Sequence, residues 1–138
     1  MIRVTRRYEF PAAHVLASAQ LSDADNARIF GKCANPHGHG HDYRVEVSVS
    51  GRVDPDTGQI IALDLLDEIF DEVVRERWSH RMLNELDVFE TRVPTAENIA
   101  LALFSAMAPQ IADRSGARLA GVRVVETENN YFEVGDPG

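Results

Sequence analysis

The sequence predicts an α+β fold with a mostly antiparallel sheet, and three observations support this prediction. Residues 43–49 alternate apolar and polar side chains, which is typical of a strand with one buried face. Two stretches in the middle of the chain carry apolar residues at helical spacing. Strand-like segments stand before and after these helices instead of alternating with them, and this order favours an antiparallel sheet.

The first third of the chain predicts one strand and a long loop. Residues 2–10 alternate loosely and are expected to form a strand that ends at Pro11, because proline cannot donate to a sheet. Residues 15–36 show no clean period and predict a loop with at most one helical turn near 23–29. A loop of this length in a small domain is more often functional than idle.

The remaining elements follow in order. A strand ends at Gly51, and turn residues at 54–58 predict a hairpin with a second strand at 59–62. The final segments, 119–125 and 131–134, predict a long strand and a short partner.

Two helices are expected between the strands. The first begins with Asp64 as its N-cap and runs to about Trp78. Its face at a period of 3.6 residues consists of Leu66, Ile69, Phe70, Val73 and Arg77. The second begins after Thr95 as N-cap and ends at about Met107, before Pro109.

Composition limits the function classes. A chain of 138 residues predicts a single domain, 1–138. The net charge of −8 and the pI of about 5.0 argue against nucleic acid or a membrane surface as partner. No apolar run has the length of a membrane span, and the N-terminus does not resemble a signal peptide. Cys33 is the only cysteine, which excludes an intrachain disulfide and fits a cytoplasmic location.

The strongest chemical signal is the run His37-Gly38-His39-Gly40-His41. In an extended segment residues two apart share a face, so three imidazoles point to the same side. A catalytic zinc usually takes three protein ligands and keeps one open position. The run therefore favours a metal site over a surface histidine cluster, and zinc over iron because no carboxylate lies among the histidines. Spacing alone leaves open which histidines bind, and His14 is a fourth candidate upstream.

Residues 30–43 then resemble a known family almost residue for residue. They read F-G-K-C-A-N-P-H-G-H-G-H-D-Y, and the 6-pyruvoyltetrahydropterin synthase family has F-G-K-C-x-N-P-x-G-H-G-H-N-Y. Further matches occur in the same order along nearly the whole chain, at residues 10–14, 54–58, 80–84, 94–98 and 126–130.

The resemblance implies a fold and an assembly. The family has the tunnelling fold, a four-stranded antiparallel sheet with two helices on one face. Its subunits join into a trimeric barrel, two trimers form a homohexamer, and the active site lies between subunits. Association is physically reasonable, because an exposed edge at each end of so small a sheet is a liability for a monomer.

The resemblance also implies roles for individual residues. His14, His39 and His41 match the zinc ligands, whereas His37 falls where the family varies. Cys33 matches the catalytic base and His80 the histidine that assists it. Glu126 matches the glutamate that anchors the pterin, and Thr95 and Glu97 are further candidates for the pocket.

The implied activity is that of a zinc-dependent lyase in tetrahydrobiopterin biosynthesis. Such an enzyme converts 7,8-dihydroneopterin triphosphate to 6-pyruvoyltetrahydropterin with loss of triphosphate. One alternative is the 6-carboxytetrahydropterin synthase of queuosine biosynthesis, which typically has a shorter gap between its cysteine and its zinc histidines than the six positions from Cys33 to His39. Another is a catalytically silent pterin-binding or metal-binding protein, because Ser79 replaces the family's aspartate before His80. Asp87 is a candidate substitute for that aspartate.

Overall fold

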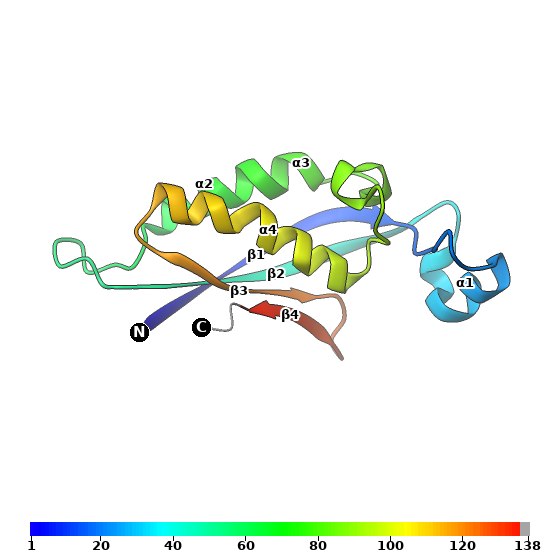
Figure 1. Ribbon diagram of the computed structural model, residues 1–138, viewed down its shortest axis with the longest axis horizontal. Helices are drawn as coiled ribbons and strands as arrows, with labels where there is room; N and C mark the ends of the chain where they lie inside the picture. The colour runs from blue at the N-terminus through cyan, green and yellow to red at the C-terminus, as the bar shows by residue number, and fades with distance from the viewer. Residues whose placement is uncertain (136–138) are drawn as a thin grey trace.

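The computed structural model describes residues 1–135 and contains one four-stranded sheet in the order β1-β2-β3-β4. Its strands are β1 (Ile2–His14), β2 (His39–Gly51), β3 (Arg118–Val125) and β4 (Tyr131–Gly135). All neighbouring pairs are antiparallel, and the helices α2, α3 and α4 cover one face of the sheet (Figure 1). The predicted α+β class, with two helical segments on one face, is confirmed. Among the described residues no helix combines the length and apolar content needed to cross a membrane.

The helical layer consists of two long segments. One is continuous through α2 (Leu63–Phe70), the π-helical turn η2 (Asp71–Arg75) and α3 (Glu76–Trp78). The other is α4 (Ala96–Arg114). Between these segments and the sheet lies the core, whose largest fully buried side chains include Tyr43, Phe10, Phe70, Leu66 and Leu103.

The π-helical turn changes which residues of the first segment face the sheet. A regular helix predicts Val73 and Arg77 on the buried face, but Val74 and Trp78 are buried there instead. The wider π turn inserts one residue per turn and shifts the following face by one position. Asp64 is not the N-cap either. Ala62 occupies that position, and Asp64 lies in the first turn, where its charge complements the helix dipole.

Strand β1 continues through Pro11 to His14, three residues further than predicted. The carbonyl of Pro11 points away from β2 and accepts a hydrogen bond from the backbone N–H of His80 at 2.7 Å. In an antiparallel strand the N–H and C=O of one residue point to the same side. The N–H that proline lacks would therefore face outward, so Pro11 costs no bond to β2.

Helix α4 begins where predicted and ends later. The hydroxyl of Thr95 accepts from the backbone N–H of Asn98 at 3.3 Å, which confirms the N-cap. The helix continues past Pro109 to Arg114 because Pro109 is exposed, and water can satisfy the carbonyl that proline leaves free.

Two expectations for the loops need correction. Residues 59–62 form no strand. The backbone N–H of Asp54 donates to the carbonyl of Gln59, the N–H of Gly58 donates to the carbonyl of Asp54, and Ile61 inserts into the core. Residues 15–36 are more ordered than a loop, because they hold α1 (Asp23–Phe30), capped by the Ser22 hydroxyl, and the 3₁₀ turn η1 (Gly31–Ala34). Two further 3₁₀ turns follow α3, η3 (Leu83–Glu85) and η4 (Asp87–Phe89).

Candidate metal centre

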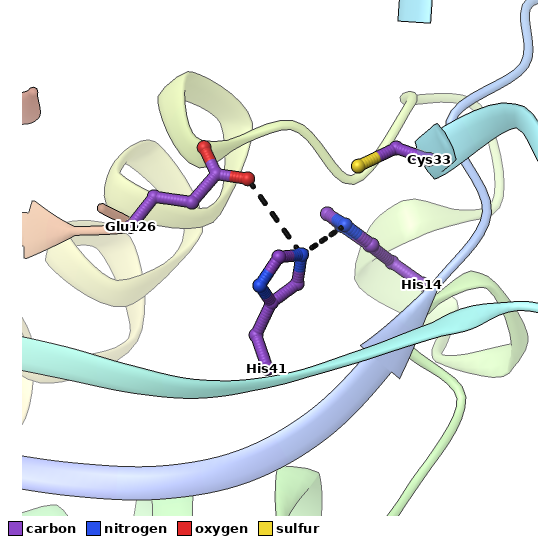
Figure 2. A group of neighbouring side chains, drawn as sticks. All are labelled: His14, Cys33, His41 and Glu126. Carbon is purple, nitrogen blue, oxygen red and sulfur yellow. Dashed lines mark hydrogen bonds and ion pairs between the residues drawn. The ribbon is translucent and has the colours of Figure 1, made fainter. Parts of the chain in front are cut away.

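Four side chains that can bind a metal meet at the end of the sheet nearest α1. His14, Cys33, His41 and Glu126 each offer one ligand atom, and these atoms lie within 4.8 Å of one another. Figure 2 shows the four side chains converging on a common point from separate segments. His14 ends β1, Cys33 belongs to η1, His41 is near the start of β2, and Glu126 directly follows β3.

The strand register places the two histidines side by side. His41 pairs with Ala12 across β1 and β2, and His14 pairs with His39, so all these side chains point to the helix-covered face. The turn before β2 needs Gly38, which has a φ of 88°. A side chain there would also place its Cβ 2.5 Å from Cε of Met82.

The fully buried His14 has its tautomer set by a backbone carbonyl. Its Nδ1 lies 2.9 Å from the carbonyl oxygen of Pro94. A carbonyl only accepts hydrogen bonds, so Nδ1 carries the proton and donates it. Nε2 therefore keeps its lone pair, which faces the centre of the group and Nε2 of His41. This is the arrangement that metal-binding histidines usually have.

The spacing of the two imidazoles fits a tetrahedral metal. Nε2 of His41 lies 3.1 Å from Nε2 of His14. Two nitrogens that each lie 2.0–2.1 Å from a tetrahedral zinc are separated by roughly 3.3 Å. Burial lowers the pKa of both histidines, and the neighbouring imidazoles lower that of His41 further. Both rings are thereby held in the neutral form that binds metals.

Cys33 and Glu126 complete the group with a thiol and a carboxylate. Oε1 of Glu126 lies 3.8 Å from Nε2 of His41. Burial raises the pKa of the Cys33 thiol, and the negative charge of Glu126 raises it further. A hydrogen bond from the backbone N–H of Leu16 to the Cys33 carbonyl, 2.6 Å long, ties η1 to the end of β1. Nitrogen, sulfur and oxygen donors of this kind suit zinc.

The other histidines of the run lie at different distances from this group. The ring of His39 stacks edge-on against that of His41 with 4.4 Å between centroids, but His39 is not one of the four. His37 is exposed in the preceding turn, where its backbone N–H donates to the side chain of Asn35.

His80 lies apart from the four residues. It is exposed at the outer edge of β1 and has a φ of 58°, the one positive φ among the described residues other than glycine. The hydroxyl of Ser79 is buried without a hydrogen-bond partner in the described part of the chain. Within residues 1–135 no ion pair joins His80 to Asp87.

The two pocket candidates, Thr95 and Glu97, lie at the start of α4. Thr95 uses its hydroxyl as the N-cap and directly follows Pro94, whose carbonyl holds His14. Glu97 is exposed in the first turn of the helix.

Two residues that contact His14 were not predicted from the sequence. Tyr43 is fully buried, and its hydroxyl lies 3.0 Å from Nδ1 of His14. Burial and the nearby Glu126 and Cys33 raise the pKa of this phenol. The alternation of β2 indicates that Tyr43 is a core residue but says nothing of its hydroxyl. The Pro94 contact uses a backbone atom, which leaves no signal in the sequence.

Replacing Tyr43 by phenylalanine is expected to weaken metal binding by about tenfold. This is the lower end of the loss seen when a group that hydrogen-bonds to a metal-binding histidine is removed. The ring keeps its stacking on Phe10, with 5.4 Å between centroids, so the fold should persist. Competition with a chelator measures the affinity. Tyr8→Phe is the matched control, because its hydroxyl bonds to Asp67 far from the site. Equal affinities of Tyr43→Phe and wild type would contradict the role given to the hydroxyl.

Comparisons with known proteins agree along the chain. Residues 3–137 match the family model described as 6-pyruvoyl tetrahydropterin synthase. The 6-pyruvoyl tetrahydrobiopterin synthase of Homo sapiens is 38% identical over 129 residues, which cover 93% of this chain and 87% of the relative. A putative 6-carboxy-5,6,7,8-tetrahydropterin synthase of Archaeoglobus fulgidus is 36% identical over 117 residues, covering 85% and 90%. The solved structure of Caenorhabditis elegans 6-pyruvoyl tetrahydropterin synthase has a TM-score of 0.88 at 36% identity, covering 98% of this chain and 95% of that one.

Proposed function

The chain belongs to the 6-pyruvoyl tetrahydropterin synthase family and has its tunnelling fold, and from this premise we propose that it is a zinc-dependent lyase. The substrate is 7,8-dihydroneopterin triphosphate and the product is 6-pyruvoyltetrahydropterin, formed with loss of triphosphate. The convergence of His14, His41, Cys33 and Glu126 is the observation that carries the proposal. Residues 1–138 act as one domain, in the cytoplasm, on a free pterin.

The zinc ligands in this proposal are His14, His41 and His39. The first two already present neutral nitrogens at a suitable separation, and the third lies beside His41. These histidines would hold the zinc, which when bound would supply Lewis-acid chemistry toward the hydroxyl groups and the developing carbonyl of the substrate's side chain.

The remaining residues orient the substrate and move its protons. Cys33 acts as the base that takes protons from the side-chain carbons and returns them, since a neighbouring cation favours the thiolate form of a cysteine. Glu126 accepts hydrogen bonds from the amino and ring N–H groups of the pterin, with Thr95 and Glu97 bordering the pocket. A carboxylate that is only 18% exposed is well suited to this role because few waters compete for it.

The position of His80 supports a site shared between subunits. In this proposal His80 assists the base Cys33. It lies at the outer edge of β1, however, and is not among the side chains that meet at the metal centre. Assembly into a trimeric barrel, with two trimers forming a homohexamer, presents this edge to a neighbouring copy. The neighbour's His80 then assists Cys33 in proton transfer.

The second candidate is a 6-carboxytetrahydropterin synthase of the queuosine pathway, and the Archaeoglobus relative favours it. Incubation of the zinc-loaded protein with dihydroneopterin triphosphate distinguishes the two, since mass spectrometry separates the pyruvoyl from the carboxy product. Release of triphosphate with the pyruvoyl product supports our proposal. Retention of the pterin without turnover would instead identify a catalytically silent pterin-binding protein.

Ser79→Asp is expected to increase kcat severalfold. A carboxylate beside His80 holds the imidazole's tautomer and raises its basicity more than a hydroxyl does. The Ser79 hydroxyl has no partner to lose. Steady-state kinetics measure the effect, with Ser79→Asn as the uncharged control of similar size. A decrease in kcat for Ser79→Asp, with the fold retained, would show that this chain does not use a relay of that type.

A further inference from the structure

A row of alternating charges crosses all four strands on the face that the helices leave uncovered. We call it the charged row, and it consists of Arg7, Glu46, Arg123 and Glu133, one residue from each strand in order. The residues are direct cross-strand partners in the sheet register. Their neighbours along each strand, such as Tyr8 and Val122, are buried on the other face, so the charged side chains point away from the helices.

Ion pairs connect the row from end to end. Nε of Arg7 lies 3.3 Å from Glu46, and Nη1 of Arg123 lies 3.4 Å from the other oxygen of Glu46. Glu133 then binds Arg123 through one oxygen, Oε1, which receives Nε at 2.8 Å and Nη2 at 2.6 Å. The order of signs from β1 to β4 is therefore positive, negative, positive, negative.

The two ends of the row have unused hydrogen-bonding capacity of opposite sign. Within residues 1–135 the terminal nitrogens of Arg7 have no partner, and neither has Oε2 of Glu133. These ends are also exposed, at 85% of the Arg7 side chain and 54% of the Glu133 side chain, against 19% for Glu46. Among the described residues, one edge of the sheet thus ends in unpaired terminal nitrogens of Arg7 and the other in an unpaired carboxylate oxygen of Glu133.

The backbone of β1 is open at the same place. The outward groups of Pro11 and Ala13 are bonded to His80 and Arg81. Because the backbone N–H and C=O of every second residue point outward, those of Arg3, Thr5 and Arg7 also face away from β2. Among the described residues, the backbone groups of these three residues have no backbone partner. An open strand edge of this kind is a template for another strand.

We propose that the charged row sets the register in which copies of this chain join edge to edge, with Glu133 on β4 facing Arg7 on β1 of the next copy. The alternation of charge then continues across the junction. The contact is heterologous, since two different edges meet, and such contacts form a ring when the rotation between successive copies closes. This inference rests on the proposed barrel. His80 is bonded to Pro11, four residues beyond Arg7 on β1. In this register, that part of β1 in the next copy lies at the same end of the sheet as Glu126.

Charge inversion tests the proposal on the full chain. Arg7→Glu and Glu133→Arg each place like charges at every junction, and each is expected to raise the concentration for half-dissociation at least about tenfold. Inverting all four residues together restores alternation within and between copies, and should return assembly to near the wild-type level. Arg52→Glu, in an exposed loop, is the charge-matched control and should assemble as wild type does.

Light scattering coupled to size-exclusion chromatography gives the mass over a dilution series, and circular dichroism confirms that each variant is folded. Single variants that assemble like the wild type would overturn the proposed register. A folded four-residue variant that stays dissociated would overturn it as well. A wild-type chain that is monomeric at all concentrations would show that the proposed barrel does not form. Zinc content and pterin binding are measured separately, so this outcome is distinguishable from a failure of the proposed function.

Discussion

Replacement of His14 by alanine is expected to abolish stoichiometric zinc binding and, with it, turnover. The side chain is fully buried, its Nδ1–H is fixed by Pro94, and its Nε2 has no role in the fold other than facing His41. Structural zinc sites with four ligands bind with about 10–16 kcal/mol, so one ligand accounts for roughly 3 kcal/mol, or more than a hundredfold in affinity. Metal analysis after dialysis measures the loss.

Two further variants serve as a second test and a control for this prediction. His41→Ala should lose zinc to a similar extent, and its side chain is 17% exposed, so a smaller cavity results and the fold is less at risk. His37→Ala should retain zinc, because His37 lies exposed outside the centre. A chain that loses zinc on replacement of His37 and keeps it on replacement of His14 would show that the ligand assignment is wrong.

Replacement of Cys33 by alanine is expected to lower kcat by about 10²- to 10⁴-fold, the usual contribution of a general base. Zinc content should remain unchanged, since the three histidine ligands are intact. Product formation and metal content are measured on the same preparation. Unchanged turnover in the Cys33→Ala variant would exclude the thiol as the base.

The pH dependence of Cys33 reactivity has a definite sign. Burial and the charge of Glu126 both disfavour the thiolate, so they raise the thiol pKa in the metal-free protein. Alkylation by iodoacetamide should therefore be slow at neutral pH, with a midpoint above the ordinary thiol range. Glu126→Gln removes one of the two causes and should shift this midpoint to lower pH. Since Cys33 is the only cysteine, the rate reports on one site.

The strands and helices were largely predictable because their polar and apolar side chains alternate with the period of each element. Residues 43–49 and the N-cap at Thr95 appear in the structure as the sequence indicates. The errors arose where backbone geometry decides the outcome. Pro11 continues a strand because its missing N–H faces outward, and Pro109 stays within a helix because it is exposed. Neither orientation can be read from the residue type.

The metal centre shows the same division. Spacing identified a histidine run but could not choose among its members, and the resemblance to a family selected His14, His39 and His41. In the structure His14 and His41 meet Cys33 and Glu126, while His39 stands beside them. The strand register brings His14 and His41 together although they are 27 residues apart in the sequence. A local pattern does not contain that information.

The π-helical turn η2 makes the number of residues in its helix as important as their identity. It accommodates one residue more than a regular helix would, and that extra residue turns Trp78 into the core and brings His80 to the carbonyl of Pro11. Deleting a single residue from Asp71–Arg75 would leave a regular α-helix in which Val74 and Trp78 still face the core, because the tighter turn compensates for the missing residue. Inserting a further residue there would instead rotate everything after it by about 100° around the helix axis. This segment is therefore expected to tolerate a one-residue deletion better than a one-residue insertion, which would disconnect His80 from the edge of the sheet without changing any side chain of the site.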